Sequence, residues 1–147
     1  MYGKRWRCAI AALSQTASSV GIGSSGTRVR VVQAGENITQ GQPVYLNSSD
    51  SKHYRADANA SATTAKAIGI ALSPASTNGF FIMQEGSGGL VNLGATLVVG
   101  ETYCVGATAG QVNPIGDLTT GDYPCILGTA TTTALIQTLY SYTGVPK

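Results

Sequence analysis

Residues 34–46 read AGENITQGQPVYL, and residues 94–105 read GATLVVGETYCV. Both stretches contain two glycines with Ile or Leu midway between them, followed by a short apolar segment. Glycine readily adopts the φ > 0 conformations of tight turns, and the central aliphatic side chain can fill the core between two such turns. We therefore interpret four glycines as structural turns of a repeated β unit: Gly35, Gly41, Gly94 and Gly100.

A second motif recurs with the same offset, the one that carries Gly35 onto Gly94. Residues 68–71 read IGIA, and residues 127–130 read LGTA. Two motifs in one register favour an internal repeat, which we predict to span about residues 34–84 and 93–140. The repeat would form two similar β units, related by a pseudo-twofold axis, that bury their apolar faces against each other.

Short apolar segments separated by clusters of Gly, Asn, Asp and Ser make up most of the chain. This spacing is typical of a sandwich or barrel rather than of alternating strands and helices. Only 11% of the residues are charged and 19 are glycine, which also disfavours helices. We predict one all-β domain over residues 28–147, a single β-sandwich or barrel-like domain. Its strands would lie near 27–33, 42–46, 53–57, 65–72, 79–85, 89–92, 102–105, 111–115, 124–130 and 134–140.

Residues 1–27 are interpreted as a basic N-terminal arm. A short helix is expected within residues 2–17, and a flexible linker over residues 18–26. Residues 1–30 contain five basic and no acidic side chains, whereas residues 31–147 contain four basic and seven acidic ones. A basic arm on a mildly acidic domain favours attachment to an acidic surface. The basic residues are too sparse to neutralise many phosphates, so we expect no direct nucleic-acid binding.

Signals for export or membrane insertion are weak. The apolar run over residues 8–13 is shorter than the core of a signal peptide. No stretch approaches the ~20 apolar residues that cross a bilayer, so we expect no membrane partner. The odd number of cysteines argues against a closed disulfide framework and favours reduced thiols in a protein made in the cytoplasm.

Residue types that carry out catalysis are scattered along the chain. His53 is the only histidine, and its polar neighbours indicate a solvated surface position. The carboxylates show no spacing that implies joint acid–base work, and no cluster has metal-ligand spacing. Lys66 lacks the adjacent Met common beside the modified lysine of biotinyl or lipoyl carrier domains. We therefore expect no enzymatic activity, no cofactor and no metal.

Four segments together resemble a group of phage and prophage proteins known as capsid decoration or cement proteins. The resemblance covers roughly residues 29–140, whereas residues 1–27 match no pattern of that group. The similar segments are residues 34–46, 67–72 (AIGIAL), 94–105 and 121–130 (GDYPCILGTA).

The resemblance implies a structural virion protein that binds the outside of a major-capsid-protein lattice and stabilises it. Such proteins are usually homo-oligomers, trimers or dimers, and a terminal arm often supplies part of their grip. The candidate partner-binding residues are therefore those of the basic arm: Lys4, Arg5, Trp6 and Arg7. Trp and Arg are also the residue types that most often dominate protein interfaces.

A head-fibre or tail-fibre adhesion module that binds host-surface glycans is the alternative function. Sugar binding requires exposed aromatic platforms beside Asp or Asn, and the single Trp lies in the arm. A glycan array would discriminate between the two functions.

Overall fold

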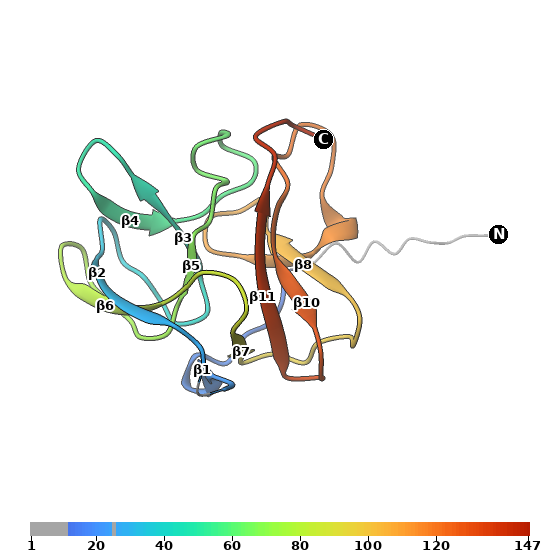
Figure 1. Cartoon of the computed structure of the whole chain (residues 1–147). Coiled ribbons are helices and arrows are strands. Elements are labelled where there is room, and N and C mark those ends of the chain that lie inside the picture. Colours follow the sequence, from blue (N-terminus) through green and yellow to red (C-terminus); the bar gives the residue numbers. More distant parts are fainter. Residues whose placement is uncertain (1–11, 25) are drawn as a thin grey trace.

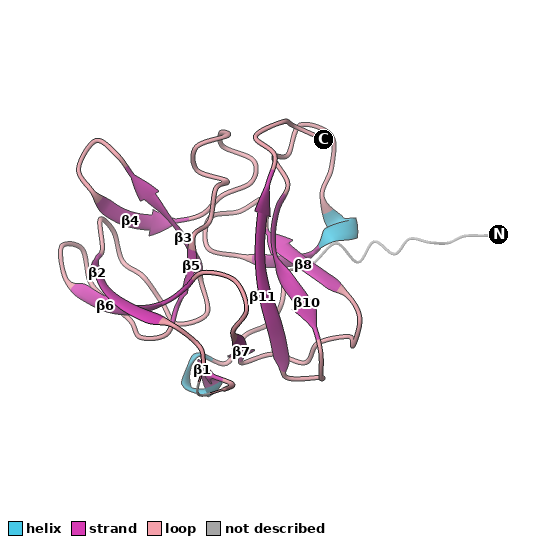
Figure 2. Cartoon of the chain, in the orientation of Figure 1, coloured by secondary structure: helices cyan, strands magenta, loops and turns pink. Residues whose placement is uncertain are grey.

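The computed structural model describes residues 12–24 and 26–147, and the regular secondary structure of these residues is almost entirely β-strand (Figures 1 and 2). The prediction of an all-β fold is confirmed, and each predicted strand corresponds to an observed one. The strands are β1 (Val20–Ile22), β2 (Val29–Gln33), β3 (Pro43–Asn47), β4 (Lys52–Arg55), β5 (Gly69–Ala71), β6 (Phe80–Glu85), β7 (Leu90–Leu93), β8 (Thr102–Val105), β9 (Val112–Pro114), β10 (Cys125–Ala130) and β11 (Leu135–Tyr142). Two short 3-10 helices, η1 (Ala17–Ser19) and η2 (Ile115–Asp117), accompany them.

The strands form two antiparallel sheets. The first has the order β2-β6-β5-β3-β4 and occupies the left half of Figure 1. The second has the order β1-β7-β11-β10-β8-β9. With β1 set aside, the two orders are identical, since β2 to β6 correspond in sequence to β7 to β11. We call residues 29–85 the first unit and residues 90–142 the second unit.

Strand register is also shared between the units. In the first unit β3 pairs with β5 so that Val44 lies opposite Gly69. In the second unit β8 pairs with β10 so that Tyr103 lies opposite Gly128. Tyr103 follows Val44, and Gly128 follows Gly69, by the same number of residues that separates the repeated sequence motifs.

Turn hydrogen bonds follow the same offset. The backbone N–H of Gly41 donates to the carbonyl of Ala71 over 2.8 Å, and the N–H of Gly100 donates to the carbonyl of Ala130 over 2.8 Å. These matching bonds, sheet orders and registers support an origin of the two units by duplication, which we propose as the explanation of the repeat.

The buried apolar side chains form two clusters. The smaller one lies inside the first unit and consists of Val32, Ala34, Ile38, Val44, Ala71, Phe81 and Met83. The larger one fills the second unit and extends to the first through Ala56, Ala58, Ala67 and Ile70. Ile38 and Leu97, the aliphatic residues between the paired glycines, are each only 2% exposed. Each unit therefore has its own interior, and the larger cluster joins them.

The linker predicted over residues 18–26 is wrong in its central part. Val20–Ile22 form β1, which pairs antiparallel with β7, and Val20 is buried. Serine and glycine neighbours suggest flexibility, but the edge of β7 offers unpaired backbone groups that a strand can satisfy. Most of the helix predicted over residues 2–17 lies outside the described residues, and residues 12–16 are not helical.

His53 is another correction, because it is buried rather than solvated. Its ring lies edge-on to that of Phe81, with the centroids 6.3 Å apart. No group of the described chain hydrogen-bonds to its Nδ1 atom. Alternation along β4 directs this side chain into the first unit, whereas the neighbouring Lys52 and Tyr54 point the other way. Burial lowers the pKa of His53, because the interior disfavours the charged imidazolium.

Acid is therefore expected to destabilise the protein through His53. Below the ordinary histidine pKa of 6.5, His53 is protonated in the unfolded chain, whereas its lowered pKa keeps it neutral in the folded chain. The free energy of unfolding therefore falls as pH falls through this region. The loss is at most about 1.4 kcal/mol per pH unit. His53→Val, which places valine where the second unit has Val112, should remove this contribution. Urea unfolding between pH 5 and 8 would show it as a shallower pH dependence for the variant; equal slopes would contradict the assignment.

Candidate interaction surface

The four glycines predicted as turns do not all play the same part. Gly41, Gly94 and Gly100 have φ of 89°, 70° and 86°, a region that side chains with a Cβ atom disfavour. Gly35 does not have positive φ. A Cβ atom there would collide with the ring of Tyr54, so close approach of an aromatic ring explains this glycine. All four are structural positions in loops and carry no reactive group.

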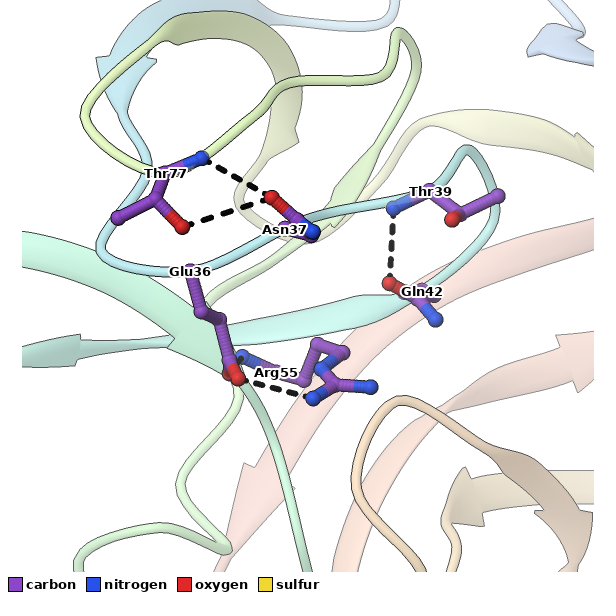
Figure 3. Close-up of polar contacts among 6 residues, drawn as sticks. All are labelled: Glu36, Asn37, Thr39, Gln42, Arg55 and Thr77. Atoms are coloured by element: carbon purple, nitrogen blue, oxygen red, sulfur yellow. Dashed lines mark hydrogen bonds and ion pairs between the residues drawn. The ribbon is translucent and has the colours of Figure 1, made fainter.

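The loop between Gly35 and Gly41 is held by polar side chains (Figure 3). Glu36 forms an ion pair with Arg55 at 2.9 Å and also accepts the Arg55 backbone N–H at 2.8 Å. Asn37 accepts a hydrogen bond from the backbone N–H of Thr77 at 3.1 Å. The hydrogen bond from Arg55 to Glu36 raises the pKa of the guanidinium. These contacts fix the loop over the interior of the first unit.

The candidate arm residues Lys4, Arg5, Trp6 and Arg7 lie outside the described residues. Residues 12–16 are docked on the second unit. The N–H of Leu13 donates to Val112 over 2.9 Å, and the N–H of Thr16 donates to Gly94 over 2.6 Å. The amide of Gln15 donates to the carbonyls of Gly41 (3.1 Å) and Leu93 (2.9 Å), one in each unit. This segment is part of the folded domain and connects the two units.

An apolar face covers the outside of β2 and β6. Val31 and Phe80 are 65% and 67% exposed, and Val29 and Ile82 are 46% and 43% exposed. Val31 lies directly opposite Ile82 in the register, so these side chains are neighbours. We call these four residues the β2–β6 face. Contiguous exposed apolar groups of this kind are typical of interaction sites.

A shallow cleft separates the first unit from the end of β11. It has a volume of about 400 Å³ and is lined by Leu46, Ala62, Thr63, Lys66, Ile68 and Tyr142. Tyr140, next to it on β11, donates its hydroxyl to Gln84 of β6 over 2.5 Å and thereby links the units. The lining is largely apolar and contains one charged group, Lys66.

The two cysteines within the described residues are free and buried. Burial raises the pKa of Cys104 to about 12 and that of Cys125 to about 11, so neither thiol is ionised at neutral pH. No group of three or more His, Cys, Asp or Glu suited to a metal ion occurs in residues 12–24 and 26–147. No helix in the same part of the chain is long and apolar enough to span a bilayer.

The fold and its surface define an all-β module whose accessible features are an apolar face, an open strand edge and a cleft. The family model of the phage cement proteins matches residues 5–85, more than half of the chain. The chain therefore belongs to the phage cement protein family, and it has a structural, capsid-associated role. Neither the curated proteins nor the solved structures contain a match to it.

The matched range differs from the segments that carried the resemblance in the sequence. It includes most of residues 1–27, where the sequence showed no family pattern, and it ends with β6. The family match thus covers the first unit and the segment before it, including β1.

Proposed function

We propose that this protein binds the outer surface of an assembled phage capsid lattice and stabilises the shell as a decoration or cement protein. Membership of the phage cement protein family is the observation that carries the proposal. The partner would be the major capsid protein, and the protein would reside on the exterior of the virion after synthesis in the host cytoplasm. The exposed β2–β6 face supports a role that depends on surface contact.

The basic arm is proposed as one point of attachment, through Lys4, Arg5, Trp6 and Arg7. Residues 12–16 are docked between the two units, so the arm would extend from a fixed point on the domain. A homo-oligomer, either a trimer or a dimer, is proposed as the state in which the protein acts, since capsid lattices present local symmetry axes.

Cosedimentation with capsids that lack this protein tests the function. We expect saturable, stoichiometric binding of the full chain and a higher temperature of DNA release from the bound capsids. Failure to bind assembled capsids would contradict the proposal, as would a specific signal on a glycan array, which would favour a fibre adhesion module instead.

The contribution of the arm can be measured in the same assay. The triple variant Arg5→Glu, Trp6→Ala and Arg7→Glu should weaken capsid binding about 30-fold, the effect of losing one interface hot spot of about 2 kcal/mol. Lys52→Glu serves as the matched control, because it also reverses a positive charge but lies in the β3–β4 hairpin of the domain. Equal affinity of the triple variant and the wild type would contradict a role of the arm.

A further inference from the structure

The two units differ at one edge. In the second unit β7 lies between β11 and β1, so both of its edges are paired. Its counterpart in the first unit is β2, which pairs with β6 and is the terminal strand of its sheet. The position that β1 fills beside Asn92 and Leu93 corresponds to Gln33 and Ala34 in the first unit, where β4 bridges to β2 through His53, so the outer edge of β2 is unpaired only from Val29 to Val31.

The backbone of β2 offers hydrogen-bonding groups along this edge. Arg28 accepts from Glu85, and Ala34 donates to Gly79, so the even-numbered positions bond toward β6. Antiparallel pairing alternates, so the N–H and C=O groups of the odd-numbered residues, Val29, Val31 and Gln33, point away from β6. At Gln33 this side is already covered by β4, because Ala34 forms a parallel bridge with His53 and the N–H of Gly35 donates to the His53 carbonyl. The open edge therefore extends only from Val29 to Val31.

Side chains on the two faces beside the edge have opposite character. The β2–β6 face is apolar, with Val29 and Val31 directly at the edge. Arg28 and Arg30 belong to the other face and are both exposed. Arg30 forms an ion pair with Glu85 at 3.2 Å, whereas Arg28 forms no ion pair with any described residue. The other face is therefore positively charged along the edge.

We propose that the open edge of β2 binds an extended segment of another protein in which apolar and acidic residues alternate. The segment would pair with the outer edge of β2 at Val29 and Val31. Its apolar side chains would cover the β2–β6 face, and its carboxylates would lie beside Arg28 and Arg30. Opposite charges on neighbouring strands stabilise pairing, and alternation with period two places the two types on the two faces.

The charges argue against two other occupants of this edge, a second copy of this chain and its own N-terminal arm. Antiparallel pairing of β2 with β2 of a second copy would gather the Arg28 and Arg30 side chains of both copies on one face. The arm of this chain carries Lys4, Arg5 and Arg7 and would add like charges to the same face. Like charges across neighbouring strands are destabilising. Under the proposed function, on which this part of the inference rests, the acidic segment belongs to the capsid shell.

Two synthetic peptides test the proposal on the full chain without capsids. One is a short peptide that alternates valine and glutamate, and its matched control of equal length alternates valine and lysine. The glutamate peptide should slow amide hydrogen exchange at Val29 and Val31, and the lysine peptide should not. Equal protection by both peptides, or by neither, would overturn the proposal.

Charge-reversed and apolar-face variants sharpen the test. Arg28→Glu with Arg30→Glu should weaken binding of the glutamate peptide about tenfold and favour the lysine peptide, since two cross-strand charge pairs are reversed. Val31→Asp should also weaken binding, whereas Val98→Asp should not, although both valines are 65% exposed. Unchanged peptide preference in the double variant would contradict the assigned role of the arginines.

Sedimentation velocity tests whether a second copy of this chain binds the open edge of β2. If the wild type sediments as a dimer that Val31→Asp alone converts to a monomer, the edge is a self-interface and the proposal is wrong. Failure to bind capsids with retained peptide binding would contradict the proposed function but not the strand-binding edge. Capsid binding without slower amide exchange in the presence of either peptide would support the proposed function and contradict strand binding at the edge of β2.

Discussion

Replacing Tyr103 by alanine is expected to lower the free energy of unfolding by about 4 kcal/mol, the usual cost of removing a large buried aromatic side chain. Tyr103 is 1% exposed, on β8 in the middle of the larger core cluster. Its hydroxyl also accepts the backbone N–H of Val98 over 3.0 Å. The variant would leave both a cavity and an unsatisfied donor, and urea unfolding followed by far-UV circular dichroism would measure the loss.

Tyr103→Phe separates the two contributions. It keeps the ring and removes the hydroxyl, so we expect a loss of about 1 kcal/mol, the net value of a typical hydrogen bond. The counterpart of Tyr103 in the first unit is Val44, so the larger side chain is a feature of the second unit alone. If Tyr103→Ala cost no more than Tyr103→Phe, the position of the ring in the core would be contradicted.

Alanine at Gly69 or Gly128 should be the second strongly destabilising change. A Cβ atom at Gly69 would collide with the carbonyl oxygen of Gln84, and one at Gly128 would collide with that of Gln137. Both obstacles are backbone atoms of a paired strand, which cannot move aside without disturbing the sheet. We expect a loss of about 3 kcal/mol for each variant, at the upper end of overpacking effects, measured by the same unfolding experiment.

Gly116→Ala is the control for these variants. No heavy atom lies within 4 Å of the Cβ position at Gly116, and its φ is not positive. The substitution should leave stability within about 0.5 kcal/mol of the wild type, as is usual for surface changes. If Gly69→Ala left the free energy of unfolding equally unchanged, the close contact between β5 and β6 would be contradicted.

Most strands could be predicted because their signals are local. Apolar segments ended by glycine or asparagine, such as residues 42–46 and 102–105, correspond closely to β3 and β8. The strand β1 was missed because a short segment among serines and glycines carries little local preference. Its existence depends on pairing with β7, which lies in the other half of the chain.

The candidate surface was the least predictable part. Alternation in residues 28–31 indicated a half-exposed strand, but it did not show which face is exposed. In the structure Val29 and Val31 point outward, and the following Val32 is buried. His53 illustrates the reverse case, since its polar neighbours gave no indication that it faces an apolar interior. In both cases the side of the strand that is covered depends on which distant strands lie next to it.

Local chemistry in the chain was enough to establish the all-β class and the constant offset between the repeated motifs, because turn preference and period-two alternation act over short stretches of chain. The open edge of β2, the docking of residues 12–16 between the units and the burial of His53 arose only on assembly. These features are set by which strands become neighbours in space, and that choice depends on contacts between residues far apart in the chain.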